Sequence, residues 1–214
     1  MNEREELKIA LFASGKGSNF AAILRGIDDG SIPRARIALV ISDNPGAGAL
    51  QVARDRAIPA VHIDRRLFAS GKEFARALKS LLNEHRVNFI VLAGYLKKVD
   101  DSIIDEYENR IINIHPALLP AFGGKGMYGM KVHEAVIATG QTVSGATVHF
   151  VDKEYDHGAI ILQRSVPVTS EDTPQSLAAK VQTIEHGLYP EVLRLFAEGR
   201  VQISNGKVRI PGTP

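Results

Sequence analysis

Hydrophobic residues occur in short blocks along the first half of the chain, and amphipathic stretches separate these blocks. The blocks lie at 7–14, 36–43, 59–64 and 87–95, and each has the length of a buried strand. Apolar residues at helical spacing stand between them, most clearly at 68–86. Strands that alternate with helices over such short connections predict right-handed crossovers and a parallel sheet covered on both faces. We therefore predict an α/β fold whose amino-terminal half is doubly wound and Rossmann-like.

The pattern changes in the second half of the chain. Two β-rich runs at 142–151 and 158–168 are joined by a short polar loop, which predicts a mixed or antiparallel part of the sheet. Between 173 and 196 the apolar residues recur at helical spacing, so one long helix is expected to pack across the sheet. A small hairpin around Asn205 and Gly206 is predicted to close the chain.

Residue types also mark several boundaries. Asn44 and Pro45 stand where the second helix is expected to begin, and Gly140 stands where a short helix over 131–140 is expected to end. The segment 121–130 contains four glycines and shows no periodicity. It is predicted to be a loop that can move over a ligand.

Composition narrows the possible functions. Of the 214 residues, 44% are hydrophobic and 23% charged, as in an ordinary soluble globular protein. The 26 basic and 24 acidic residues leave no basic stripe, so no nucleic-acid partner is expected. The chain has no cysteine, which excludes disulfides, thiolate nucleophiles and zinc sites built on cysteine. We see no apolar signal core or membrane-spanning run, so a cytoplasmic location and no membrane partner are predicted.

A glycine-rich turn follows the first predicted strand. Gly15 and Gly17 would let the backbone approach a ligand, and Ser18 and Asn19 stand at the start of the next helix, where N–H groups favour a phosphate. The alternative is a tight turn in which Ser18 or Asn19 only caps the helix. A dinucleotide fingerprint would need a small residue where Phe20 stands, so no nicotinamide cofactor is predicted.

The strand predicted at 111–115 carries the main chemical signal. Asn113 and His115 alternate along it, so they share one face, and Pro116 stops the strand. With Asp156 they offer an amide donor, an imidazole and a carboxylate, a set suited to acyl transfer to an amine. Asn113 and protonated His115 would stabilise the oxyanion, and Asp156 would accept the amine proton and raise the pKa of His115.

Each residue of this set also has a purely structural interpretation. Asn113 could cap a turn, His115 could be a hydrogen-bonded structural histidine, and Asp156 could belong to a hairpin loop. His115, His133, His149 and His157 all lie in this half of the chain, but none of them pairs at the HExxH spacing, so no metal is expected. His149 alternates with apolar neighbours and is interpreted as a packed strand residue.

These residues lie within longer segments that resemble the folate-dependent formyltransferases, most closely the members that act on glycinamide ribonucleotide. The segments are SGKGSN at 14–19, VLAGYLKKV at 91–99, INIHPALLP at 112–120, SGATVHFV at 144–151, DHGAIILQ at 156–163 and VQTIEHGLYP at 181–190. The resemblance covers nearly the whole chain. It implies one formyltransferase domain over 1–214, with a phosphate-binding half at 1–100 and a catalytic and folate-binding half at 101–214.

The resemblance implies transfer of the formyl group from 10-formyltetrahydrofolate, the donor co-substrate, to the amine of glycinamide ribonucleotide in purine biosynthesis. Asn113, His115 and Asp156 match the catalytic trio of that family. By the same match the ribonucleotide and its phosphate would be held by Gly17, Ser18, Asn19, Pro116, Gln182 and Glu185. The folate would be held by Leu96, Lys97, Val99, Val151 and Asp152.

Two positions and one loop depart from the family pattern. Lys97 stands where many members have an arginine, and a lysine cannot repeat a planar two-point contact. The loop at 121–130 differs from the shorter loop of better-known members, so no functional residue is transferred to it. His157 replaces a glycine seen in some relatives.

Three rival functions are kept. Methionyl-tRNA formyltransferase shares the trio but carries an additional carboxyl-terminal domain, and formyltetrahydrofolate deformylase uses water as acceptor and carries an amino-terminal regulatory domain. A non-catalytic phosphoribosyl or folate binding module is the third.

The protein is expected to be a monomer or a homodimer.

Overall fold

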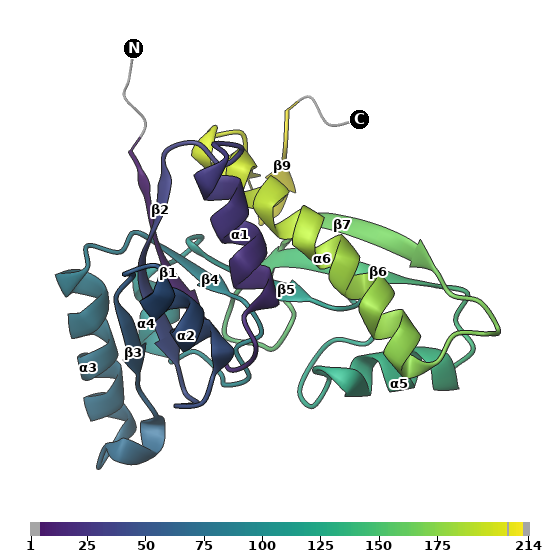
Figure 1. Ribbon diagram of the computed structural model, residues 1–214, viewed down its shortest axis with the longest axis horizontal. Helices are drawn as coiled ribbons and strands as arrows, with labels where there is room; N and C mark the ends of the chain where they lie inside the picture. The colour runs from purple at the N-terminus through teal and green to yellow at the C-terminus, as the bar shows by residue number, and fades with distance from the viewer. Residues whose placement is uncertain (1–4, 205, 212–214) are drawn as a thin grey trace. The chain divides into compact units, whose positions relative to one another are not determined.

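The computed structural model describes residues 5–204 and 206–211 (Figure 1). These residues form two compact units, one ending at Ile112 and the other beginning at Asn113. The fold is of the α/β class, with mostly parallel strands and antiparallel strands toward the carboxyl terminus, as the sequence predicts. No helix within the described ranges is long and apolar enough to cross a membrane.

The first unit contains a parallel arrangement of four strands in the order β3-β2-β1-β4. The strands are β1 (Leu7–Phe12), β2 (Ala35–Ser42), β3 (Ala60–His62) and β4 (Phe89–Leu92). The helices are α1 (Ser18–Asp28), α2 (Gly48–Asp55), the 3-10 helix η1 (Arg65–Leu67), α3 (Gly71–Glu84) and α4 (Asp101–Glu106). Strand β1 lies between β2 and β4, and its last four residues are fully buried because it is covered on all sides. The predicted doubly wound half is thereby confirmed.

Helix α2 begins later than the sequence predicts. It starts at Gly48, whereas Asn44 forms a turn in which its side-chain oxygen accepts a hydrogen bond from the Gly46 N–H at 3.0 Å. The Asn44 N–H in turn donates to Ser42 Oγ at 3.1 Å. Asparagine competes for local backbone groups in this way, so the start signal at residues 44 and 45 was wrong by one turn.

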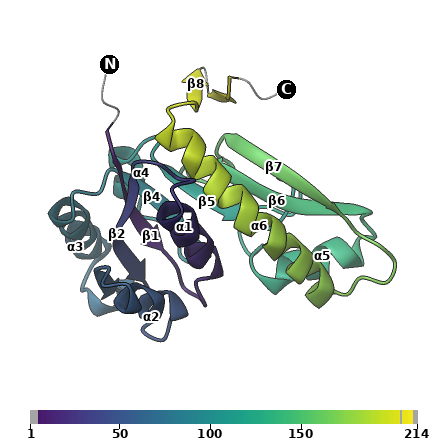
Figure 2. The same ribbon diagram turned by 45° about the horizontal axis from the view of Figure 1, so that its top comes forward.

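The second unit combines an antiparallel strand pair with two helices. Strand β5 (Ile111–His115) enters it from the first unit and lies beside β6 (Val143–Phe150), which pairs with β7 (Ile160–Pro167). Helix α5 (Met130–Ala138) precedes β6, and helix α6 (Pro174–Ala197) follows β7. Figure 2 shows α6 running along β6 and β7. Helix α6 contacts both of these strands and also contacts α5. The predicted mixed part and the predicted long helix are both confirmed.

Helix α6 starts and packs as its sequence dictates. Thr173 caps it by accepting from the Ser176 N–H at 3.1 Å, while the Ser176 hydroxyl accepts from the Thr173 N–H at 3.0 Å. The face toward the core is fully buried and consists of Leu177, Val181, Leu188, Tyr189, Val192 and Leu193. Near its end Phe196 packs edge-on against Phe150 of β6, with ring centroids 5.8 Å apart.

Two short segments complete the unit. The glycine-rich loop between β5 and α5 exposes Tyr128, whose ring lies 4.9 Å from Lys131 Nζ. Strands β8 (Gln202–Ser204) and β9 (Lys207–Arg209) pair antiparallel, as the predicted hairpin requires. Asn205 of the predicted turn lies outside the described residues.

Candidate active site

Strand β5 carries Asn113 and His115 in the second unit. Alternate residues of a strand share a face, so both side chains are directed to the same side. His115 is 3% exposed, whereas Asn113 is half-buried. The strand ends at His115, directly before Pro116, because proline has no N–H with which to extend the ladder.

The two ring nitrogens of His115 have different partners. Nε2 lies 2.8 Å from the Phe122 carbonyl oxygen, which can only accept, so Nε2 carries the proton in the neutral ring. Nδ1 lies 3.5 Å from Asp156 Oδ2. The nitrogen of His115 that can gain a proton therefore faces the carboxylate of Asp156.

A second histidine, His149 of β6, takes part in the same cluster. Its Nδ1 donates to the Phe150 carbonyl oxygen at 2.8 Å, which leaves Nε2 as an acceptor. Nε2 accepts from the Asn113 side-chain amide at 3.1 Å and lies 3.6 Å from Asp156 Oδ1. The interpretation of His149 as merely packed was incomplete: the ring is 2% exposed, but both nitrogens contact polar groups.

The glycine-rich loop holds this cluster from one side. The Gly124 N–H donates to Asp156 Oδ2 at 2.9 Å, and the Phe122 carbonyl binds His115 as described. Phe122 and Asp156 both adopt left-handed backbone conformations, with φ values of 57° and 56°. Such conformations are strained for a bulky residue and occur mainly where the surroundings enforce them. A loop to which no functional residue was assigned from the sequence thus contacts both His115 and Asp156.

Burial decides the charge of His115. Burial lowers its pKa below the ordinary histidine value, and the nearby Asp156 carboxylate offsets that effect only in part. The expectation that the charge of Asp156 raises this pKa is confirmed, but the larger effect of burial was not foreseen, because the depth of burial cannot be read from residue spacing. Neutral His115 with its proton on Nε2 is therefore the main form near pH 7.

Asp156 shows the opposite balance. Burial raises the pKa of its carboxyl group, but His149 and His115 in their protonated forms, together with the Gly124 N–H, lower the pKa below the usual aspartate value. Asp156 is ionised near neutral pH. The cluster thus contains a carboxylate that can accept a proton and an imidazole nitrogen that can receive it next.

Thr147 fixes the segment that follows β5. Its hydroxyl donates to the Ala117 carbonyl at 2.6 Å and accepts from the Leu119 N–H at 3.0 Å. The Gln163 side-chain amide also donates to this hydroxyl, at 2.9 Å. Thr147 is completely buried. Sequence reasoning assigned neither Thr147 nor Gln163 a role, because both fit the pattern of ordinary strand residues.

The glycine-rich turn of the first unit has the geometry that its sequence suggests. Gly17 is the cap residue of α1, with φ 84°, and Ser18 is the first helical residue. A side chain at Gly17 would lie 3.0 Å from the Ala49 Cα, so glycine is required there. The alternative in which Ser18 or Asn19 caps the helix does not hold, because both lie inside it.

The segments expected to hold the folate lie in both units. In the first, Leu96 is 53% exposed and Val99 is buried; Lys97 and Val99 line a cavity of about 600 Å³. In the second, Val151 and Asp152 follow β6 and are half-buried. Asp152 accepts from His157 Nδ1 at 3.0 Å, and this contact raises the pKa of His157.

The residues expected to hold the ribonucleotide in the second unit are Pro116, Gln182 and Glu185. Pro116 directly follows His115 and is half-buried. Gln182 and Glu185 are three residues apart on α6, so they share one side of that helix. Across the described ranges no three or more His, Asp and Glu side chains are grouped so that they could hold a metal ion.

The chain matches a known family over most of its length. The model of the formyl transferase family covers residues 7–193. The chain belongs to the formyl transferase family. The resemblance stated from INIHP and the following histidine and aspartate segment is confirmed.

Individual members of the formyl transferase family match over most of the chain. It is 44% identical to a chloroplastic phosphoribosylglycinamide formyltransferase of Vigna unguiculata, over 91% of this chain and 62% of that protein. It is 36% identical to the phosphoribosylglycinamide formyltransferase of Haemophilus influenzae, over 96% and 94% of the two chains. The chain therefore spans less than two thirds of the plant relative and nearly all of the bacterial one.

Solved structures of the family agree with this fold. Glycinamide ribonucleotide transformylase 1 of Symbiobacterium toebii is 41% identical, with a TM-score of 0.89 over 96% of this chain and 94% of that chain. A formyltetrahydrofolate deformylase of Pseudomonas syringae is 25% identical, with a TM-score of 0.85 over 97% of this chain and 66% of that one. The transformylase is therefore the nearer of these two members.

Proposed function

We propose that this chain transfers the formyl group of 10-formyltetrahydrofolate to the amine of glycinamide ribonucleotide, giving N-formylglycinamide ribonucleotide and tetrahydrofolate. The observation that carries the proposal is the grouping of an amide, a buried imidazole and a carboxylate at Asn113, His115 and Asp156. The identity of the substrates is inferred from relatives that are named for this reaction and match over more than nine tenths of the chain.

In the proposed first step the substrate amine attacks the formyl carbon, and negative charge develops on the formyl oxygen. The Asn113 amide has two N–H bonds, and one of them is engaged with His149 Nε2. The other can donate to the oxyanion. Stabilising such a charge in a site shielded from water is commonly the largest contribution to acyl transfer.

The proton of the attacking amine then has a defined route. Asp156 is ionised and accepts it, directly or through a water, and Nδ1 of His115 lies 3.5 Å away to receive it in turn. The resulting imidazolium strengthens oxyanion stabilisation. When the carbon–nitrogen bond to the folate breaks, the departing nitrogen takes up one proton, so the protons balance without a covalent enzyme intermediate.

The substrates would be held as follows. Gly17, Ser18 and Asn19 bind the ribonucleotide phosphate at the start of α1, where N–H groups and the helix dipole favour an anion. Gln182, Glu185 and Pro116 contact the remainder of the ribonucleotide. The donor folate would contact Leu96, Lys97, Val99, Val151 and Asp152.

A paired turnover assay tests the proposal. Purified protein is mixed with 10-formyltetrahydrofolate, and tetrahydrofolate release is followed with and without glycinamide ribonucleotide. We expect release only when the ribonucleotide is present. Equal release in both samples would mean that water is the acceptor, as in the deformylase, and no release in either would favour a binding module.

Location in the cytoplasm and a monomeric or homodimeric state remain predictions.

A further inference from the structure

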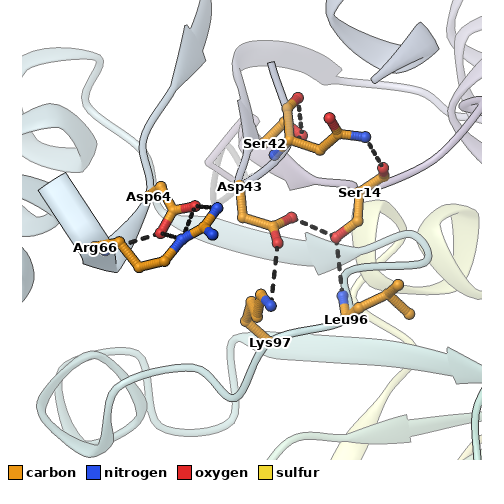
Figure 3. A network of polar contacts seen from close by, with 8 residues as sticks. Ser14, Ser42, Asp43, Asp64, Arg66, Leu96 and Lys97 are labelled. Carbon is orange, nitrogen blue, oxygen red and sulfur yellow. Dashed lines mark hydrogen bonds and ion pairs between the residues drawn. The ribbon is translucent and has the colours of Figure 1, made fainter. Parts of the chain in front are cut away.

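Ser14 follows β1 and holds the turn that comes after β4. Its N–H donates to the Gly94 carbonyl at 3.1 Å. Its Oγ accepts from the Leu96 N–H at 3.0 Å, as Figure 3 shows. Gly94 has a left-handed φ of 73°, which reverses the chain at this point. One buried residue, 8% exposed, thus fixes both sides of the turn.

Asp43 sets the direction of the Ser14 hydroxyl. Ser14 Oγ donates its single proton to Asp43 Oδ1 at 2.5 Å, since an ionised carboxylate can only accept. A lone pair of the same oxygen is thereby left for the Leu96 N–H. Asp43 Oδ2 lies 3.9 Å from Lys97 Nζ (Figure 3). The carboxylate therefore contacts the 96–97 segment both through Ser14 and through a charge.

The loop after β2 is tied to the same residue. The Asn44 side-chain amide donates to the Ser14 carbonyl at 3.1 Å, and Ser42 Oγ donates to the Asn44 carbonyl at 3.0 Å. The N–H, carbonyl and hydroxyl of Ser14 are thus all engaged. Ser14 joins the loops that follow three strands, β1, β2 and β4.

The anchored segment has little else to hold it. The Leu96 side chain is 53% exposed and that of Lys97 is 63% exposed, so packing does not fix these two residues. Lys97 lines the cavity described above, and Asp43 lines it too. The hydrogen bond at the Leu96 N–H is therefore the contact that sets the backbone of the segment assigned above to the folate.

We propose that Ser14 and Asp43 are positioning residues for the formyl donor: they hold the main chain at Leu96 and Lys97 in the conformation that binds the folate. This inference rests on the proposed function, because it takes the assignment of Leu96, Lys97 and Val99 to the donor from there. Neither residue is assigned contact with the reacting atoms.

The test compares Ser14→Ala, Ser14→Thr and Asp43→Asn in the full chain. Ser14→Ala removes only the hydroxyl contacts, because the backbone bonds to Gly94 and Asn44 remain. We expect its KM for 10-formyltetrahydrofolate to rise about five- to tenfold, the effect of losing one hydrogen bond. The dissociation constant for the ribonucleotide, measured by calorimetry, should stay within about twofold.

The other variants distinguish positioning from general destabilisation. Ser14→Thr keeps the hydroxyl and should recover most of the donor affinity. Asp43→Asn can still accept a hydrogen bond, so its donor KM should rise only about two- to threefold. If Ser14 and Asp43 act as one unit, the double variant with Ser14→Ala and Asp43→Asn should have a donor KM no higher than that of Ser14→Ala alone. Ser31→Ala, at a hydroxyl that bonds the Gly26 carbonyl, is the matched control.

The failures can be told apart. Suppose that the wild-type chain shows ribonucleotide-dependent turnover. Variants that keep the wild-type donor KM, or that lose affinity for both substrates equally, then overturn this inference and leave the proposed function standing. If the wild type releases tetrahydrofolate without the ribonucleotide, the proposed acceptor is wrong, but the donor KM of the same variants still decides the inference. A wild type that neither binds nor consumes the donor overturns both.

Discussion

Asp156 combines a strained backbone with several polar contacts. Its φ of 56° lies in a region where aspartate and asparagine are tolerated better than most residues, and its carboxylate reaches His115, His149 and the Gly124 N–H. Asn at this position would therefore keep the backbone while it removes the charge. This separates the fold of the loop from its chemistry.

For Asp156→Asn we expect transfer to fall by about 10²- to 10⁴-fold, because the amide cannot accept a proton from the attacking amine. Ribonucleotide binding should be retained. Steady-state kinetics and calorimetry on the same preparation measure both quantities, and Asp55→Asn, at an exposed carboxylate of α2, is the control. Near-normal turnover would rule out the proposed route for the proton.

The lowered pKa of His115 predicts how stability depends on pH. The unfolded chain binds a proton at this histidine near pH 6.5, whereas the folded chain binds it only at lower pH. The contribution of His115 to the free energy of unfolding is therefore constant above the ordinary pKa of 6.5, and it decreases as the pH falls below that value. The contribution of Asp156, whose pKa is also lowered, is lost only below its ordinary value of 3.8.

Urea unfolding between about pH 7.5 and 5.5 should show this decline, and His115→Gln should make it shallower. His157→Gln is a control of opposite sign. The pKa of His157 is raised by Asp152, so its stabilisation is present at low pH and its loss should steepen the decline slightly. An unchanged slope in His115→Gln would contradict the assigned direction.

Residue identity and spacing placed Asn113 and His115 on one face of a strand, as the structure shows, while the catalytic role of the trio stays a prediction. They did not reveal His149. A histidine among apolar strand residues gives the same pattern whether its nitrogens are idle or bound, and only the structure shows Asn113 and Phe150 as partners. The effect of burial on the pKa of His115 could not be predicted for a related reason, since burial arises from residues distant in sequence.

At the scale of elements, the glycine-rich loop packs closely against Leu119 and Asp156 at Gly123. A Cβ at Gly123 would lie 2.5 Å from a methyl group of Leu119 and 3.2 Å from the Asp156 Cβ. Alanine there must displace one of them. The loop is therefore coupled to the carboxylate by shape as well as by the Gly124 hydrogen bond.

Gly123→Ala should lower both kcat and stability, the latter by about 1–3 kcal/mol as in other overpacked sites. Gly187→Ala is the matched control, because a Cβ at that position of α6 meets no atom within 4 Å. It should stabilise the helix by about 0.5–1 kcal/mol with turnover unchanged. Thermal unfolding and steady-state kinetics of the two variants measure the contrast, and equal behaviour would show that the loop adapts.

Element types followed from periodicity, and boundaries followed less closely. The long helix was predicted to within a residue because Thr173 and Pro174 are strong start signals and no competing cap lies nearby. The start of α2 was misplaced because Asn44 bonds Ser42 and Gly46 instead of opening a helix. Local polar competition of this kind depends on where the preceding strand ends.

At the scale of the whole molecule, stability and chemistry should be separable. Leu188 of α6 is completely buried in the core of the second unit and contributes no polar group. Leu188→Ala should reduce the free energy of unfolding by about 2–5 kcal/mol, the range for a large core residue. Activity per folded molecule, measured well below the melting temperature, should stay close to that of the wild type. A proportionate loss of activity would mean that the core and the site are coupled.

The α/β class and the family could be predicted because the apolar blocks and the INIHP segment are local in sequence. The two compact units divide after Ile112, inside a strand. The division into functional halves at 1–100 and 101–214, which the resemblance implies, stays a prediction. A strand carries no signal that its two ends belong to different units.

The glycine-rich loop exposes Tyr128, and the chain has no cysteine. A single thiol introduced at this tyrosine would be the only reactive sulfhydryl in the molecule, so one fluorophore or spin label could be attached without removing any native thiol. The motion of the loop that carries the partners of His115 and Asp156 could then be followed in real time as each substrate is added.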